Sequence, residues 1–171
     1  CMTDLSNAGV FEGRSDLGFA PCTPAACMEI LDYYGIDCKG KNAVVIGRSL
    51  VVGKPAAMML MGKNATVTVC HTKTVNTAEI ARNADILVSA AGVLGSLTKE
   101  YVRPGQVVID VSINWDAEKP NAKGGKGAIA GDAKFEEVEP IVEAITPVPG
   151  GVGSVTTSVL MKHVVEAAER A

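Results

Sequence analysis

Short hydrophobic runs alternate with stretches of helical periodicity along most of the chain, and these runs are wholly or mainly apolar. Runs of this kind are typical of strands buried on both faces of a sheet. Strands are therefore expected at 43–46, 65–69, 86–89, 107–110 and, more briefly, 128–130 and 144–145. Helices are expected at 24–34, 55–61, 77–83, 155–170 and 135–144, where Pro140 interrupts the pattern.

This alternation predicts an α/β domain of the Rossmann-like, doubly wound type, with a mainly parallel sheet and helices on both faces. The domain is expected to occupy 22–171 around a single core. Residues 1–21 show no sustained period and contain many turn formers, so we expect an irregular interdomain connector there. The Gly- and Lys-rich stretch 123–127 is expected to be a flexible surface loop.

Composition describes an ordinary globular protein and excludes several classes of partner. The 171 residues suit one domain, and only 4% of them are aromatic, so the core must consist of aliphatic side chains. A net charge of −3 provides no general attraction to nucleic acid. We therefore expect no nucleic acid partner. The chain has neither a membrane-length apolar run nor a secretory pattern, so we also expect no membrane partner and a cytoplasmic location.

The cysteines give no sign of a metal or redox centre. Five are present, and no two of them form a Cys-x-x-Cys pair. Free thiols in a reducing compartment are the expected state, because a chain of this length does not need disulfides to hold its core together. The chain begins at Cys1 rather than at a methionine, which leads us to expect a fragment or a processed product.

The segment most informative about chemistry joins the first predicted strand to the next helix. It contains Gly47-Arg48-Ser49, followed by Gly53 and Pro55. A glycine-rich turn in this position lets the backbone approach a pyrophosphate, and the helix N-terminus favours its negative charge. The spacing departs from Gly-x-Gly-x-x-Gly, so an ordinary strand-to-helix turn remains an alternative.

The end of the second predicted strand bears on the choice of cofactor. An NAD site usually presents Asp or Glu there to the ribose 2′-hydroxyl. Here the strand runs into Cys70-His71-Thr72-Lys73-Thr74, which contains no acid. Hydroxyls and a cation, together with Arg48 in the turn, suit a 2′-phosphate, and the sequence therefore favours NADP. The alternative is that these are only solvated loop residues.

Three further segments follow strand ends, where open α/β sheets bind ligands. They are 89–92, 110–114 and 146–153, of which the first two are also explained as tight turns. Two prolines in the third give a stiff loop and its glycines leave room, so we expect that loop to face a ligand. No catalytic constellation is visible. Cys70 and His71 are strand neighbours with side chains directed apart, and His163 is expected to pack or to lie on the surface.

Several of these segments occur in order in one known family. Besides the glycine turn they are 21–24, 65–71, 84–88, 108–114, Gly131-Asp132 and 145–153. Together they resemble the bifunctional methylenetetrahydrofolate dehydrogenase/methenyltetrahydrofolate cyclohydrolases over nearly the whole chain. The resemblance implies a two-domain enzyme that oxidises 5,10-methylenetetrahydrofolate with NADP and hydrolyses the methenyl product to 10-formyltetrahydrofolate. It also implies tetrahydrofolate derivatives as substrates and a homodimer.

The resemblance assigns roles by position. It implies that NADP is bound by Gly47, Arg48, Ser49, Thr72, Gly92, Ile113 and Thr156. It implies that the folate side is faced by Pro149, Gly150 and Gly151. The catalytic lysine, tyrosine and aspartate of the family are expected upstream of Cys1, so no catalytic residue is expected in this chain, and the chain alone is expected to be inactive.

The sequence also departs from the family. Ala26 and Ser112 stand where glycines are common, and Ser154-Val155 replaces a usual Pro-Met. These departures leave the loops around Ile113 and Thr156 open. Two other interpretations remain: a cofactor domain like that of shikimate dehydrogenase, and a non-catalytic nucleotide-binding or assembly module.

Overall fold

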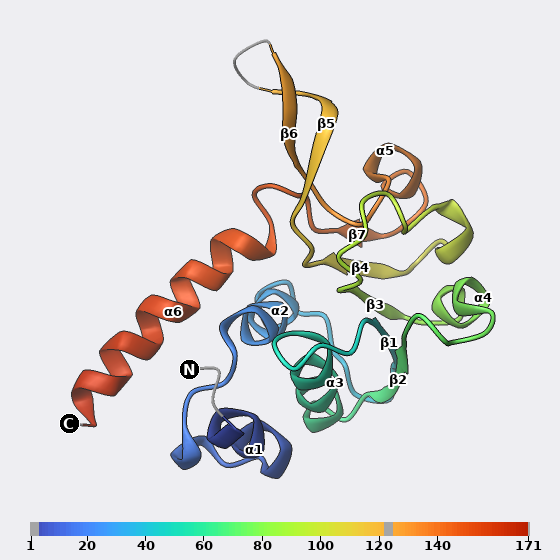
Figure 1. Ribbon diagram of the computed structural model, residues 1–171. Coiled ribbons are helices and arrows are strands. Elements are labelled where there is room, and N and C mark those ends of the chain that lie inside the picture. The colour runs from blue at the N-terminus through green and yellow to red at the C-terminus, as the bar shows by residue number, and fades with distance from the viewer. Residues whose placement is uncertain (1–3, 122–124, 171) are drawn as a thin grey trace.

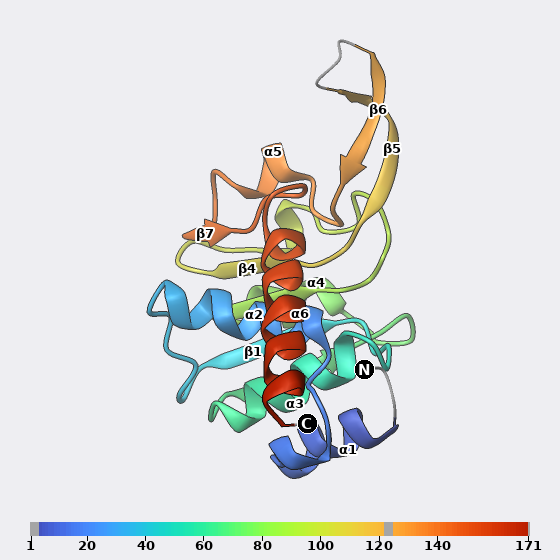
Figure 2. The same ribbon diagram turned by 90° about the vertical axis from the view of Figure 1, so that its left-hand side faces the viewer.

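The computed structural model describes residues 4–121 and 125–170 and shows a parallel sheet with helices on both faces (Figures 1 and 2). Its helices are α1 (Asp4–Glu12), α2 (Cys22–Tyr33), α3 (Gly53–Gly62), α4 (Thr77–Arg82), α5 (Phe135–Val138) and α6 (Val152–Glu169), with 3₁₀ turns η1 (Ser15–Leu17) and η2 (Lys99–Tyr101). Its strands are β1 (Asn42–Ile46), β2 (Thr66–Cys70), β3 (Ile86–Ser89), β4 (Val107–Asp110), β5 (Asn114–Pro120), β6 (Lys126–Ala130) and β7 (Ala144–Ile145).

Five strands form one sheet in the order β2-β1-β3-β4-β7, and all neighbouring pairs are parallel. The chain runs from β1 outward to β2 and then crosses back to β3 on the other side of β1. The loops after β1 and β3 therefore leave the sheet in opposite directions, which is the position where open α/β sheets bind ligands. The predicted doubly wound fold is confirmed.

Two apolar layers cover the two faces of the sheet. On one face, Val45 and Val88 pack with residues of α2, α3 and α6, including Leu31 and Leu60. On the other, Leu87 packs with residues of α4, α5 and the loop around η2. Because successive strand residues point to opposite faces, short strands that are apolar throughout supply both layers.

The predicted irregular connector at 1–21 is partly wrong, because α1 and η1 lie within it. The helical period of α1 is weak, and contacts with α3 hold it: Val10 and Phe11 share a hollow with Pro55 and Met58. Packing against another element commonly outweighs poor helix propensity. Residues 1–3 of this segment lie outside the described ranges.

Two helices and one strand show the larger remaining differences from the sequence expectation. The helix expected at 135–144 ends at Val138, ahead of the Pro140 that interrupts the pattern. Helix α6 begins at Val152, inside the predicted proline–glycine loop. Strand β5 was not expected, and it pairs antiparallel with β6 in a hairpin that projects from the sheet (Figure 1). The predicted loop at 123–127 is wrong at its end, because β6 begins at Lys126, and residues 123 and 124 lie outside the described part of the chain.

None of the helices in the described ranges combines the length and the apolar character needed to cross a membrane.

Candidate nucleotide-binding site

The turn after β1 is built from glycines that leave no space for a side chain. Gly47 has φ 121°, and a Cβ on it would lie 2.8 Å from the carbonyl carbon of Ala90. Gly53 comes so close to the backbone of Gly47 that a Cβ there would lie 2.6 Å from the Gly47 carbonyl carbon. The turn is therefore pressed against both the loop after β3 and the first residue of α3, an arrangement that only glycine allows.

Ser49 holds the start of α3. Its Oγ accepts hydrogen bonds from the backbone N–H groups of Val52, at 3.0 Å, and Gly53, at 3.4 Å. These are N–H groups that a helix start leaves without an intrahelical partner. The hydroxyl proton of Ser49 is not used in these bonds, so the same side chain can still donate to an anion in front of the turn.

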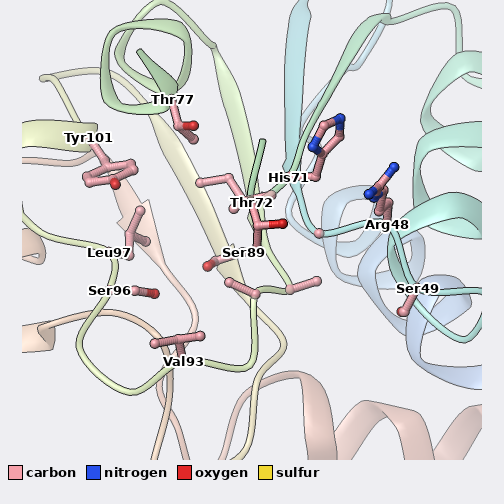
Figure 3. Close-up of a pocket in the computed structure, with 14 residues that line it drawn as sticks. Arg48, Ser49, His71, Thr72, Thr77, Ser89, Val93, Ser96, Leu97 and Tyr101 are labelled. Carbon is pink, nitrogen blue, oxygen red and sulfur yellow. The ribbon is translucent and has the colours of Figure 1, made fainter. Parts of the chain in front are cut away.

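A cavity of about 390 Å³ opens beside this turn, between the loops that follow β1 and β3 (Figure 3). Its lining residues are Ile46, Gly47, Arg48, Ser49, His71, Thr72, Thr77, Ser89, Ala90, Ala91, Val93, Ser96, Leu97 and Tyr101. Four of the predicted cofactor residues are thus brought together: Gly47, Arg48, Ser49 and Thr72. None of the lining residues is an acid, and Arg48 lies on the same side of the cavity as His71.

The neighbours Cys70 and His71 face apart, as expected from strand geometry. Cys70 is buried in the layer beneath α4, and burial raises the pKa of its thiol. His71 lines the cavity, and its Nδ1 accepts a hydrogen bond from the backbone N–H of Lys73 at 3.1 Å. This bond restrains the orientation of the imidazole at the wall of the cavity.

A second hollow of about 270 Å³ gathers the residues expected on the folate side. Pro149, Gly150 and Gly151 line it from the loop before α6, and Ile113 lines it from the start of the hairpin. The Val148–Pro149 bond is cis, and Gly150 has φ 101°, a conformation that favours glycine. Ile113 is 69% exposed, so its large apolar side chain is accessible to a ligand in this hollow.

Two predicted cofactor residues line neither space. Gly92 has φ 68° and lies between lining residues Ala91 and Val93, but its own surroundings are open. Thr156 lies in the first turns of α6, where its Oγ1 donates to the carbonyl oxygen of Val152 at 2.9 Å. Their roles toward a cofactor stay predictions.

Two buried acids lie near the two spaces: Asp110 lines the second hollow, and Asp132 lines neither. Burial raises the pKa of the Asp110 carboxyl, although backbone N–H groups, including that of Ala133, act in the opposite direction. The sequence places both acids near strand ends and allows Asp110 either to orient loops or to contact a ligand, but it does not show which groups their carboxylates bind. In the described part of the chain, no three His, Cys, Asp or Glu side chains are grouped so as to hold a metal ion.

Sequence reasoning missed the far wall of the cavity. Thr77 comes from α4, Ser96 and Leu97 from the loop after β3, and Tyr101 from η2. These residues follow no motif, and only the packing of α4 beside η2 brings them to one place. No sequence signal available here would have found them.

Comparisons with known proteins agree with this geometry. A family model described as tetrahydrofolate dehydrogenase/cyclohydrolase, NAD(P)-binding domain, matches residues 21–171. The bifunctional protein FolD of Carboxydothermus hydrogenoformans is 56% identical over 165 residues, which cover 96% of this chain and 55% of that protein. The protein of the same name from Clostridium botulinum strain Okra is 52% identical over 170 residues, covering 99% of this chain and 57% of its own length.

Solved structures give the same result. The FolD methylenetetrahydrofolate dehydrogenase/cyclohydrolase of Campylobacter jejuni has a TM-score of 0.88 at 40% identity, over 99% of this chain and 57% of its own. The Trypanosoma brucei enzyme, solved with NADP cofactor and an inhibitor, has a TM-score of 0.88 at 37% identity, over 100% of this chain and 59% of its own. The chain thus spans little more than half the length of the relatives it matches.

Proposed function

The chain belongs to the tetrahydrofolate dehydrogenase/cyclohydrolase family, and we propose that it is the NADP-binding domain of an enzyme with both activities of that name. The full protein would oxidise 5,10-methylenetetrahydrofolate with NADP and hydrolyse the methenyl product to 10-formyltetrahydrofolate. The observation that carries the proposal is the acid-free cavity at the strand crossover, where Arg48 and the glycine turn meet. Family membership leaves the shikimate dehydrogenase-like alternative without support.

The chemistry of the cavity fits a dinucleotide carrying an additional phosphate. The turn through Gly47 allows close approach of a pyrophosphate, and the N-terminus of α3 favours its charge. Arg48 supplies a permanent cation, and Thr72 supplies a hydroxyl from the segment after β2. No lining residue offers the carboxylate that normally accepts the ribose 2′-hydroxyl of NAD. A 2′-phosphate therefore matches these side chains better than a hydroxyl does.

The remaining predicted residues are assigned to the two sides of the reaction. Gly92, Ile113 and Thr156 are proposed to face the nicotinamide half of the cofactor. Pro149, Gly150 and Gly151 are proposed to face the folate, supported by their shared hollow with Ile113. When bound, NADP accepts the hydride. We assign the proton chemistry to residues outside this sequence, because the relatives are longer and no acid–base pair lines either space in the described ranges.

Titration calorimetry tests the proposal directly. Wild type is expected to bind NADP more tightly than NAD. Arg48→Ala is expected to weaken NADP binding by about tenfold or more, the cost of losing one charged hydrogen bond, and to leave NAD binding nearly unchanged. Lys162→Ala, which removes an exposed cation from α6, is the charge-matched control and should bind both cofactors normally. Equal affinities for NADP and NAD, unaffected by Arg48→Ala, would refute the 2′-phosphate assignment.

Domain limits and surroundings complete the proposal. We place the cofactor domain at 22–171 and treat 1–21 as the segment that links it to a folate-binding half. A homodimer and a cytoplasmic location are also proposed. Four exposed apolar side chains along α6 support an interface, namely Leu160, Met161, Val164 and Val165. Free thiols at the four cysteines in the described ranges support a reducing compartment. Light scattering after size-exclusion chromatography measures the oligomeric state.

A third interpretation, a nucleotide-binding module without catalysis, makes a different prediction. The full-length protein would then bind NADP but would not reduce it in the presence of 5,10-methylenetetrahydrofolate. Our proposal expects NADPH formation by the full-length protein, followed at its absorbance band, and negligible turnover by this chain alone.

A further inference from the structure

The carboxylate of Asp132 is the most heavily hydrogen-bonded side chain near the site. The residue is fully buried just after β6, and six donors reach its two oxygens. Oδ1 accepts from Val93 N at 2.8 Å and Asn114 Nδ2 at 3.1 Å. Oδ2 accepts from Ser89 Oγ at 2.9 Å, Ala91 N at 2.9 Å, Gly92 N at 3.3 Å and Ser112 Oγ at 2.7 Å. A carboxylate, which only accepts, matches a set made up entirely of donors.

These donors come from the two segments that face the two ligand spaces. The backbone N–H groups of Ala91, Gly92 and Val93 belong to the loop after β3, which lines the cofactor cavity. Ser112 and Asn114 flank Ile113, which lines the second hollow. One buried side chain therefore fixes the cofactor loop and the hairpin start relative to each other.

Ser112 takes part in the same network, although glycine is common at this position in the resembling family. Its hydroxyl donates to Asp132 and its oxygen accepts the N–H of Gly92 at 3.2 Å. The departure from glycine thus adds a bridge between the two segments. Substitution of Ser112 would therefore remove part of this hydrogen-bond network while Asp132 stays in place.

The carboxylate of Asp110 binds the backbone next to Asp132. Its Oδ1 accepts from Ser112 N at 3.1 Å, and its Oδ2 accepts from Ala133 N at 2.8 Å. A Cβ at Gly131 would lie 2.6 Å from the carboxyl carbon of Asp110, so the chain passes directly over this acid. The backbone N–H of Asp110 also donates to Thr146 Oγ1 at 2.9 Å, at the start of the proline–glycine loop.

We infer that Asp132 is a positioning residue that sets the cofactor loop at 90–93 against the segment 112–114, and thereby the cofactor against the substrate side. The inference rests on the proposed function, because it concerns the same site. The carboxylate is shut away from both spaces and acts only through the backbone and side chains that it binds. Misplacement of such loops is costly, since hydride transfer depends on the relative orientation of the two partners.

The test compares Asp132→Asn with Gln106→Met. Asparagine keeps the shape, but its amide would face N–H donors, so at least one backbone group loses its acceptor. Gln106 is equally buried and donates to the carbonyl oxygens of Ala81 and Ala84, beneath α4 rather than beneath the loops of the site. Both changes disturb a buried polar group, and only the first disturbs the cofactor loop.

Two readouts on the folded chain separate positioning from general stability. Asp132→Asn is expected to bind NADP about tenfold more weakly than wild type, and Gln106→Met is expected to bind it within about twofold. Hydrogen exchange of the peptide covering 90–93 should accelerate in Asp132→Asn alone. Ser112→Ala, which keeps Asp132, should bind NADP about threefold more weakly than wild type. If Asp132→Asn does not fold, this variant tests the inference in its place.

Several outcomes would overturn the inference. One is that Asp132→Asn binds NADP as tightly as wild type, and another is that Gln106→Met loses as much NADP affinity at temperatures where both variants are folded. A third is that hydrogen exchange of peptide 90–93 is the same in Asp132→Asn as in wild type. If only Ser112→Ala can be measured, unchanged affinity is the contrary result. Failure of wild type to bind NADP would instead refute the proposed function, and the exchange of peptide 90–93 would still show whether Asp132 holds the loop.

Discussion

Gly53 and Gly47 touch through their backbones, although five residues separate them in the turn after β1. A Cβ on Gly53 would overlap the carbonyl group of Gly47 and lie 2.9 Å from the N–H of Arg48. The contact folds the turn back onto the first residue of α3 and sets where the backbone N–H groups in front of the helix point. The geometry of the anion-binding turn therefore depends on a missing side chain as much as on the residues present.

Replacing Gly53 with alanine tests this dependence. We expect Gly53→Ala to lower the free energy of unfolding by about 2–3 kcal/mol, because backbone must move to admit the methyl group. NADP binding should weaken as well. Gly62→Ala is the matched control, since Gly62 ends the same helix, has open space around its Cβ position and should become slightly more stable. Urea unfolding measures both, and equal stability of the two variants would contradict the close-contact argument.

Thiol reactivity should follow burial. Cys27, Cys38 and Cys70 are buried, and burial raises the pKa of Cys27 to about 12. Cys22 is only half-buried, at the start of α2, with its Sγ 3.7 Å from His163 Nδ1. We therefore expect iodoacetamide to alkylate Cys22 well before these three, which should react only after unfolding.

Peptide mass mapping over time measures this order and reads Cys1, which lies outside the described ranges, separately. Labelling in urea is the control, because all thiols should then react at similar rates. Alkylation of Cys27 in the folded chain as fast as Cys22 would show that the core opens at α2.

The sequence was sufficient for the parts of the fold that local physics dictates. Strands such as Val107–Asp110 are apolar because both of their faces are covered, and that pattern is visible without a structure. The turn at Gly47 was also visible, because glycines between a strand and a helix have few other uses. The same reasoning placed Arg48 and Thr72 in one cavity.

Other features depend on partners far along the chain. Strand β5 is mostly polar and becomes a strand by pairing with β6, so no hydrophobic alternation announces it. Helix α1 depends on α3 for its contacts. Asp132 follows a short strand like many other acids, and its role appears only when the loops after β3 and β4 close over it. Contacts between segments that are far apart in the sequence leave no pattern in the residues of either segment.

Asp85 should contribute to stability in a pH-dependent way. A hydrogen bond from the backbone N–H of Asn42, at 2.9 Å, lowers the pKa of its carboxyl, and Arg103 adds to the effect. Because the folded-state pKa lies below the unfolded value near 3.8, the contribution is present above that value and is lost as the pH falls through the folded-state pKa.

Asp85→Asn is therefore expected to lower the free energy of unfolding by about 1 kcal/mol at neutral pH, a modest figure because the pair is partly exposed. The difference from wild type should shrink as the pH falls below about 4. Urea unfolding across that range measures it, with Glu139→Gln as an exposed acid control. A difference that stays constant down to acid pH would rule out the charge as its cause.

The hairpin carries its own spectroscopic probe, since Trp115 is the single tryptophan of the chain. Its ring lies over Gly127, where φ is 97° and a Cβ would come 2.5 Å from Cζ2. Trp115 is already 67% exposed, and a methyl group on Gly127 would push its ring further from the backbone. Gly127→Ala should therefore shift the emission slightly to longer wavelength, while the main sheet unfolds at nearly the same urea concentration. Gly62→Ala should leave the emission unchanged. If Gly127→Ala emits like wild type, the ring of Trp115 does not rest on this glycine. The position of the hairpin formed by β5 and β6 would then need another explanation.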